Sequence, residues 1–189
     1  MQPDPVRPWK LRQASRFISS GGIIAYPTEA VYGLGCDPLD GAAVQRLLDL
    51  KNRPVSKGLI LIAASFTQLR PFIGPIESSV MKTLMQSWPG PNTWIVPAAE
   101  NLPRWLTGSH DTLAVRVTDH PVAAALCNSC DSPLVSTSAN PNGYRPARTA
   151  LTVRRFFPEG VELIVNGPVG QLERPTRIRN AIDGRDIRA

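Results

Sequence analysis

Residues 21–58 of the chain read GGIIAYPTEAVYGLGCDPLDGAAVQRLLDLKNRPVSKG, and this stretch decides the fold. The apolar run 22–26 predicts a buried strand. At Pro27 the pattern breaks into a predicted loop with glycines at 33 and 35, a form that lets a ligand approach the backbone closely. A second apolar run, 59–63, predicts another strand after an intervening helix. The order of these elements predicts a β-α-β crossover.

The intervening helix is expected to begin after Asp40, a favourable N-cap, and to bury the aliphatic residues of segment 44–48 on one face. Pro54 restricts the residue before it to extended conformations, so the helix must end near Lys51. On an extended segment, residues two apart project to the same side. We therefore expect Lys51 and Arg53 to point the same way, with Lys57 following closely.

Arg offers a planar fork and Lys a compact point charge, and together they suit phosphate or carboxylate. The same residues also fit a solvated basic helix end that complements the helix dipole. Residue types alone leave both interpretations open.

The remaining patterns predict one α/β domain over residues 1–189, with an open sheet of mixed parallel and antiparallel strands flanked by helices. In the predicted strand 112–117, Arg116 lies on the face opposite the aliphatic residues. The Asp183-Gly184 pair predicts a terminal hairpin. No apolar run reaches the roughly 20 residues that a membrane span needs, and no export signal is evident. We therefore expect a cytoplasmic protein without membrane contact. Other predicted strands are 93–96, 134–137 and 161–165, and other predicted helices are 8–20, 76–88, one capped by Asp119, and 149–156.

The formal net charge is +6, and nine arginines against five acidic residues place four of these charges from Arg145 onward. A basic balance favours a polyanionic partner, either nucleotide or nucleic acid, although the preference for Arg over Lys also fits a bias in genomic base composition. The lone C-x-x-C at 127–130 and the two histidines form no metal-ligand pattern, so we predict reduced thiols and no metal site.

The usual nucleotide signatures are missing, because Gly33-Leu-Gly35 is only a fragment of G-x-G-x-x-G and no Walker motif occurs. With two histidines, a Ser-His-Asp device is not expected. The strand exit 136–140 instead carries hydroxyl and amide groups that suit a ligand at a strand end, or equally a capped turn. Thr28 has the same ambiguity, and so does Glu29, which also fits a solvent-facing loop carboxylate and to which we assign no role.

Five segments taken together, YPTEAVYGLG, LKNRPVSKGLIL with its K-x-R, WPGPNT, LAVRVTDHP and VSTSAN with its S-x-N, resemble the YrdC/TsaC family of threonylcarbamoyl-AMP synthases. The resemblance runs from about Gly21 to the C-terminal tail and is to the short bacterial form. It implies an open twisted sheet with a basic concave surface. It also implies a nucleotidyltransferase that converts L-threonine, bicarbonate and ATP to L-threonylcarbamoyladenylate and pyrophosphate, with Mg²⁺ entering on ATP.

The resemblance implies that the product serves N6-threonylcarbamoylation of adenosine 37 in tRNAs reading codons that start with A. Downstream transferase proteins would collect it, and tRNA could contact the basic surface. No covalent enzyme intermediate is expected, because positioning and electrostatic stabilisation can supply most of the catalysis. Lys57 departs from longer relatives. The implied residues are Lys51, Arg53, Ser138 and Asn140 for catalysis and ATP, Thr93 and Arg148 also for ATP, and Thr28, Lys57, Arg116 and Thr176 for threonine.

Two other classes remain open from the sequence. One is an RNA-binding module without catalysis that works through the arginine-rich last quarter. The other is a carbamoyl-adenylate domain like that of the hydrogenase-maturation carbamoyltransferases, which would carry acylphosphatase-like and zinc-finger segments that the sequence lacks. The synthase hypothesis requires Lys51 and Arg53 to converge with Ser138 and Asn140 on one ligand.

Overall fold

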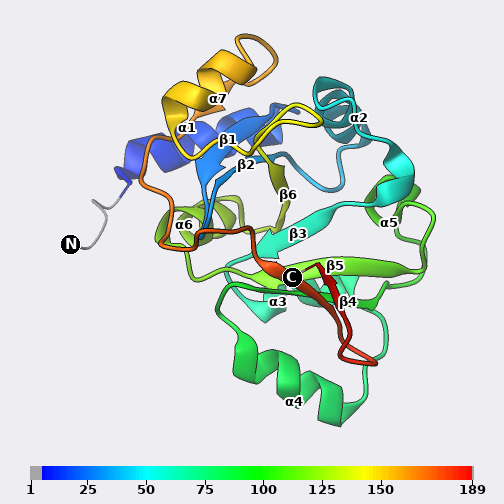
Figure 1. Ribbon diagram of the computed structural model, residues 1–189. Coiled ribbons are helices and arrows are strands. Elements are labelled where there is room, and N and C mark those ends of the chain that lie inside the picture. The colour runs from blue at the N-terminus through cyan, green and yellow to red at the C-terminus, as the bar shows by residue number, and fades with distance from the viewer. Residues whose placement is uncertain (1–5, 189) are drawn as a thin grey trace.

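A nine-stranded mixed sheet runs through the part of the chain that the computed structural model describes, residues 6–188 (Figure 1). Its strand order is β7-β1-β2-β6-β3-β5-β4-β8-β9. The predicted α/β class with a mixed sheet is confirmed. The strands are β1 (Ile24–Pro27), β2 (Tyr32–Gly35), β3 (Ile60–Ala63), β4 (Asn92–Pro97), β5 (Thr112–Val117), β6 (Leu134–Ser138), β7 (Leu163–Ile164), β8 (Arg177–Asn180) and β9 (Asp186–Arg188).

Helices connect most of the strands. None of those between residues 6 and 188 has the length and apolar character to cross a membrane. Two short 3₁₀ turns, η1 (Val55–Lys57) and η2 (Arg70–Phe72), complete the set. The helices are α1 (Pro8–Ser19), α2 (Gly41–Leu50), α3 (Phe66–Leu69), α4 (Ser78–Ser87), α5 (Arg104–Thr107), α6 (Pro121–Cys130) and α7 (Ala150–Phe156).

The glycine-containing segment after Pro27 is a strand, and the prediction of a loop there was wrong. β1 pairs with β2 in antiparallel register, with Pro27 opposite Tyr32 and Ile24 opposite Gly35. A Cβ on Gly35 would lie 2.4 Å from the carbonyl oxygen of Val135, so only glycine fits where β2 passes the backbone of β6. Glycine carries no side chain that could show the two-residue period, which is why the sequence pattern did not reveal the strand.

The predicted β-α-β crossover between the first two apolar runs was also wrong. β6 lies between β2 and β3 and pairs antiparallel with both (Figure 1). The parallel partner of β3 is β5, so β1 and β3 run in opposite directions and are not neighbours. The strand that separates them comes some 70 residues later in the chain, and no local pattern announces such an insertion.

The alternation of side chains along the strands divides the core into two layers. Leu61 and Val135 belong to the larger cluster, which α2, α3, α4 and α7 cover. Ile62 and Leu134 point to the other face and pack beneath α1 and α6. These two helices cover only part of that face, and the functional cavity lies on its remainder.

Candidate active site

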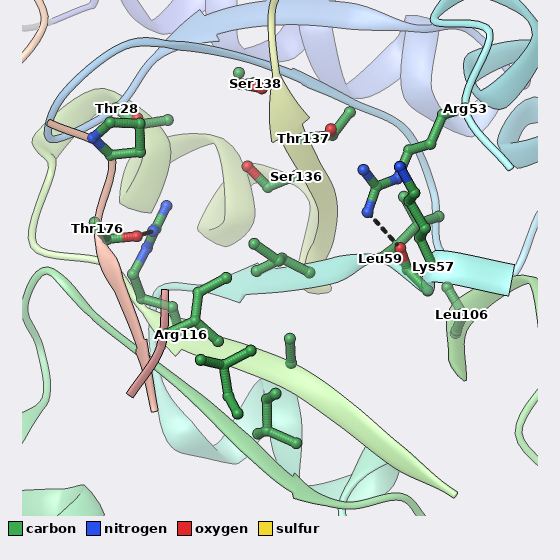
Figure 2. A pocket seen from close by; sticks show the side chains of 18 of the residues that line it. Thr28, Arg53, Lys57, Leu59, Leu106, Arg116, Ser136, Thr137, Ser138 and Thr176 are labelled. Atoms are coloured by element: carbon green, nitrogen blue, oxygen red, sulfur yellow. Dashed lines mark hydrogen bonds between the residues drawn. The ribbon is translucent and has the colours of Figure 1, made fainter. Parts of the chain in front are cut away.

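A cavity of about 500 Å³ lies on the uncovered part of the sheet face. Its lining continues the face that α6 covers further along, since Ile60 and Ser136 stand two residues from Ile62 and Leu134 on the same strands. Figure 2 shows Thr28, Arg116 and Thr176 on one side of the β6 residues 136–138, and Arg53 and Lys57 on the other. A smaller cavity of about 80 Å³ adjoins it and shares Arg53, Lys57, Thr137 and Ser138 with it.

The first group of polar residues, called here the Lys51 cluster, consists of two cations and two neutral residues: Lys51, Arg53, Ser138 and Asn140. Nζ of Lys51 donates hydrogen bonds to the backbone carbonyls of Ser138 and, at 2.8 Å, Asn140. An ammonium has three N–H donors, so one remains for a ligand. The predicted convergence of the K-x-R and S-x-N segments is therefore confirmed.

The backbone that presents this cluster differs from the expectation. Asp40 caps α2 as predicted, accepting hydrogen bonds from the backbone N–H groups of Ala42 and Ala43. The exit of α2 is not extended, however. Asn52 has a left-handed conformation with φ of 46°, and the N–H of Arg53 donates to the carbonyl of Leu48, which is a Schellman-type helix end.

Burial lowers the pKa of Lys51 from its usual value of 10.5 to about 8, and the nearby charge of Arg53 adds to this effect. Burial also lowers the pKa of Arg53, whose Nη2 donates to the carbonyl of Gly58 at 2.9 Å (Figure 2). Among the described residues, neither cation pairs with an acidic side chain. An anionic ligand would therefore stabilise both charged forms.

Asn140 fixes its own loop. Its side-chain amide donates to the carbonyls of Pro141 and Tyr144, each at 2.9 Å. Its Oδ1 is buried without a hydrogen-bond partner in the described part of the chain. Buried oxygen atoms normally have a donor, so this acceptor is one that the described protein groups leave unsatisfied beside the smaller cavity.

The second group, called here the Arg116 cluster, consists of Arg116, Glu29, Thr93, Thr118 and Thr176. Nη1 of Arg116 donates to Oγ1 of Thr176 at 2.6 Å and to Oγ1 of Thr93 at 3.3 Å. Nη2 lies 3.3 Å from Oε2 of Glu29, and the hydroxyl of Thr118 donates to Oε1 of the same carboxylate. The guanidinium is thus buried together with its counter-ion.

Glu29 is the main residue that sequence reasoning missed. It was assigned no role, and a solvent-facing loop position was one of the two interpretations left open, but it is 5% exposed in the turn between β1 and β2. Its cationic partner comes from β5, 87 residues later in the sequence. The one available signal was its position directly after an apolar strand, and that does not predict a distant arginine.

The other predicted residues fall in different places. Thr28 lines the cavity, and its hydroxyl donates to the carbonyl of Val31 at 2.7 Å. Lys57 is exposed and lines both cavities. Thr93, assigned to ATP, lies in the Arg116 cluster instead of beside Lys51. Arg148, also assigned to ATP, is exposed and donates to the carbonyl of Leu172 at 2.9 Å, outside both cavity linings.

Groups of three or more His, Cys, Asp or Glu side chains able to hold a metal ion do not occur in the described part of the chain. The three cysteines are free thiols. The polar residues that line the two cavities instead carry mainly cationic groups, hydroxyls and side-chain amides. This chemistry suits anionic ligands.

A model of the Sua5_yciO_yrdC family, described as "Telomere recombination", matches residues 16–188. Threonylcarbamoyl-AMP synthase of Halorhodospira halophila is 52% identical over 186 residues, which are 98% of this chain and 97% of that protein. A double variant of P. abyssi Sua5 superimposes with a TM-score of 0.91 at 34% identity over 97% of this chain. P. abyssi Sua5 complexed with L-threonine gives a TM-score of 0.86 at 36% identity over 91% of this chain. The chain spans about half of the two Sua5 chains, 56% and 51%.

Proposed function

The chain belongs to the Sua5/YciO/YrdC family, and on that premise we propose that it makes L-threonylcarbamoyladenylate and pyrophosphate from L-threonine, bicarbonate and ATP. It is thus an adenylating enzyme of the nucleotidyltransferase type. The observation that carries the proposal is the presence of two separate clusters in adjoining cavities on one sheet face, each built around a buried cation, with the charge of Arg116 matched by Glu29 and the charge of Lys51 unmatched. One cluster suits a polyphosphate and the other a single carboxylate.

The Lys51 cluster binds the triphosphate of ATP. Lys51 and Arg53 supply two positive charges without acidic neighbours, and the hydroxyl of Ser138 lines both cavities. Donors fixed before the reaction lower the energy of the charge that develops on the leaving pyrophosphate.

The Arg116 cluster binds L-threonine. Arg116 faces the carboxylate, and Thr28 and Thr176 line the cavity beside it. P. abyssi Sua5, at 36% identity, has been crystallised with L-threonine, which supports a threonine site in this fold. Lys57 stands near the Lys51 cluster (Figure 2), so its predicted contact with threonine is the weakest of the set, and a phosphate contact fits its place better.

The reaction needs no covalent bond to the protein. The neutral amine of threonine attacks the carbon derived from bicarbonate, forming the N–C bond of a carbamate with loss of water. A carbamate oxygen then attacks the α-phosphorus of ATP, and the bond to the β-phosphate oxygen breaks to release pyrophosphate. Holding both substrates in one cavity supplies the proximity that this sequence requires.

Magnesium enters with ATP in this proposal. The described residues that line the cavities offer no carboxylate cluster, and their charged groups are cations, so we assign the ion to the phosphates and not to these side chains. Phosphate oxygens and water are suitable ligands for Mg²⁺. We assign no step to the ion.

The adenylate serves the N6-threonylcarbamoyl modification of adenosine 37 in tRNAs that read codons starting with A. Transferase proteins would take the product from this chain in the cytoplasm, and tRNA could contact its basic surface. These partners are proposals that follow from the proposed product.

The test is mass spectrometry of a reaction that contains the protein, ATP, Mg²⁺, L-threonine and bicarbonate. We expect a threonylcarbamoyladenylate that disappears when bicarbonate or threonine is omitted. Absence of the adenylate from protein whose fold is verified by circular dichroism would overturn the proposal. An RNA-binding module without catalysis would instead bind RNA with an affinity that falls steeply with salt, and this binding would survive Lys51→Ala.

A further inference from the structure

A buried ion pair lies in the Arg116 cluster, and the proposed reaction does not use its acidic member. The side chains of Arg116 and Glu29 are each 6% exposed, and their closest charged atoms are 3.3 Å apart. Glu29 does not line either cavity, so it acts on a ligand only through Arg116. A buried arginine can be neutralised by any nearby carboxylate, which leaves open why this one is held where it is.

The position of Glu29 is fixed from several sides, independently of Arg116. Its Oε1 accepts the hydrogen bond of Thr118. Its backbone carbonyl accepts from the N–H of Leu172 at 3.2 Å, and the carbonyl of Thr28 accepts from Gly170 at 2.9 Å. A Cβ on Gly170 would lie 2.4 Å from the carbonyl oxygen of Glu29. The segment before β8 thus clamps the turn that carries the carboxylate.

The geometry of the pair is not that of a saturated salt bridge. Oε2 of Glu29 and Nε of Arg116 are both buried without a hydrogen-bond partner in the described residues. The contact between the two side chains is therefore mainly electrostatic. Glu29 thus cancels the charge of the guanidinium without taking up its donors in hydrogen bonds, and Arg116 lines the cavity, where a carboxylate is a natural partner for it.

The two clusters consequently differ in net charge although each contains a buried cation. Lys51 and Arg53 add up to two unpaired positive charges, whereas Arg116 is matched by Glu29. A polyphosphate would bind at either end of the cavity if both ends carried net positive charge. A matched arginine favours a ligand with one carboxylate and its own ammonium group, which is close to neutral overall.

We infer that Glu29 is a positioning and specificity residue, which holds Arg116 for the carboxylate of threonine and, by cancelling its charge, directs polyphosphate to the Lys51 cluster. The inference rests on the proposed function, because it assigns the two clusters to two substrates of that reaction. It predicts a change in anion selectivity, which a purely structural ion pair would not produce.

The experiment uses Glu29→Gln in the full chain, with calorimetric titration of L-threonine and, separately, of inorganic pyrophosphate. The amide oxygen of glutamine would keep the hydrogen bond from Thr118, which turns its NH₂ group towards Arg116 and places two donors against each other. We expect threonine to bind about tenfold more weakly or worse, because two donors placed against each other push the guanidinium out of the orientation that meets the threonine carboxylate. We expect pyrophosphate to bind Glu29→Gln more tightly than the parent, because the charge of Arg116 is then no longer cancelled.

Two matched variants separate this effect from a general loss of structure. Glu162→Gln removes the charge of another Glu–Arg pair, formed with Arg46 away from the cavity, and is expected to change neither titration. Glu29→Asp keeps the charge and should restore the discrimination against pyrophosphate at least in part. If Glu29→Gln does not fold, Thr118→Val decides, because it frees the carboxylate while keeping both charges and should also weaken threonine binding.

A folded Glu29→Gln protein that binds threonine and pyrophosphate within about twofold of the parent would overturn the inference, since loss of a buried charge partner produces a larger change. Unchanged threonine binding by Thr118→Val would do the same where the first variant does not fold. Both readouts measure binding. A parent protein that binds threonine but yields no adenylate would therefore count against the proposed function alone.

Discussion

The Lys51 cluster and the Arg116 cluster solve the same physical problem in opposite ways. Each buries a cation beside a ligand cavity. Arg116 is held by side chains, a carboxylate and two hydroxyls, whereas Lys51 is held by backbone carbonyls alone. The first arrangement is close to neutral, and the second keeps positive charge whose cost appears as the lowered pKa of Lys51. A buried cation stabilised only by backbone dipoles favours binding of an anion, whereas a buried cation that already has a counter-ion favours a ligand that is close to neutral.

Replacement of Lys51 gives the largest expected effect. Lys51→Ala removes an ammonium that faces the proposed phosphate site and also releases the carbonyls of Ser138 and Asn140. We expect pyrophosphate release to fall by about 10²–10³-fold, the usual cost of losing a fixed electrostatic donor. Lys82→Ala, which removes an exposed lysine on α4, is the matched control. A Lys51→Ala protein with near-parental turnover would show that the Lys51 cluster does not contribute to pyrophosphate release.

Replacement of Arg116 tests whether the Arg116 cluster serves threonine and not ATP. Arg116→Lys keeps a positive charge opposite Glu29 but loses the planar fork that donates to Thr93 and Thr176. We expect KM for threonine to rise by about tenfold to a hundredfold with little change in KM for ATP, because a point charge cannot reproduce several directed donors. Steady-state kinetics with each substrate varied in turn measures the split, and Arg46→Lys serves as the surface control. A rise in KM for ATP of the same size would mean that the clusters do not serve separate substrates.

The pH dependence of ATP affinity tests the charge of Lys51, the buried cation that has no acidic partner. Lys51 has a pKa of about 8 in the folded protein, below its usual 10.5, so it loses its charge as the pH rises above about 8. We expect the association constant for ATP to fall by up to about tenfold per pH unit there, because binding must first restore the proton. Titration calorimetry of ATP between pH 7 and roughly 10 measures this, and Lys51→Arg should flatten the profile.

The same shift has a consequence for stability, of opposite sign. Between about pH 8 and 10.5 the unfolded chain binds more protons at Lys51 than the folded one does. The free energy of unfolding therefore gains a contribution that rises with pH in this window and is constant below it.

An ATP affinity that stays level up to pH 10 would contradict the affinity prediction, because it would show that the charge of Lys51 is not what binds the phosphates.

The smallest effect concerns the helix that carries Lys51. Asp40→Ala removes the two hydrogen bonds that the Asp40 side chain accepts at the start of α2. We expect the free energy of unfolding to fall by about 1 kcal/mol, with kinetic constants unchanged, because the end of α2 at Lys51 is fixed by its own contacts. Chemical denaturation measures the stability. A parallel loss of ATP affinity would indicate that the Lys51 cluster depends on the whole helix.

Local patterns predicted the elements well where side chains repeat with a clear period. The buried strand before Pro27, the cap at Asp40 and the face of β5 that carries Arg116 all agree with the structure. The terminal hairpin is present as β8 and β9. The errors fall where glycine removes the period, at β2, and where a distant strand enters the sheet, at β6.

For the candidate site, too, sequence reasoning succeeded where short motifs carry the chemistry and failed where contacts between distant residues decide it. Lys51, Arg53, Ser138 and Asn140 were found because two short motifs carry residue types suited to anions, and the structure brings them together. Glu29 was left without a role because burial of a charge depends on its partner, and its partner lies on another strand. Thr93 was assigned to ATP, and the structure places it beside Arg116 and Thr176, which its strand position alone did not predict.

The amino-acid sequence by itself determined the class of fold, the cationic and hydroxyl-bearing segments and, through five motifs, the family. These follow from propensity, periodicity and residue chemistry, which act over a few neighbouring positions. Only the tertiary structure decided the strand order, the pairing of Glu29 with Arg116 and the lowered pKa of Lys51. Those properties arise from burial and from contacts between residues far apart in the chain, because desolvation and charge pairing exist only once the surrounding chain is in place.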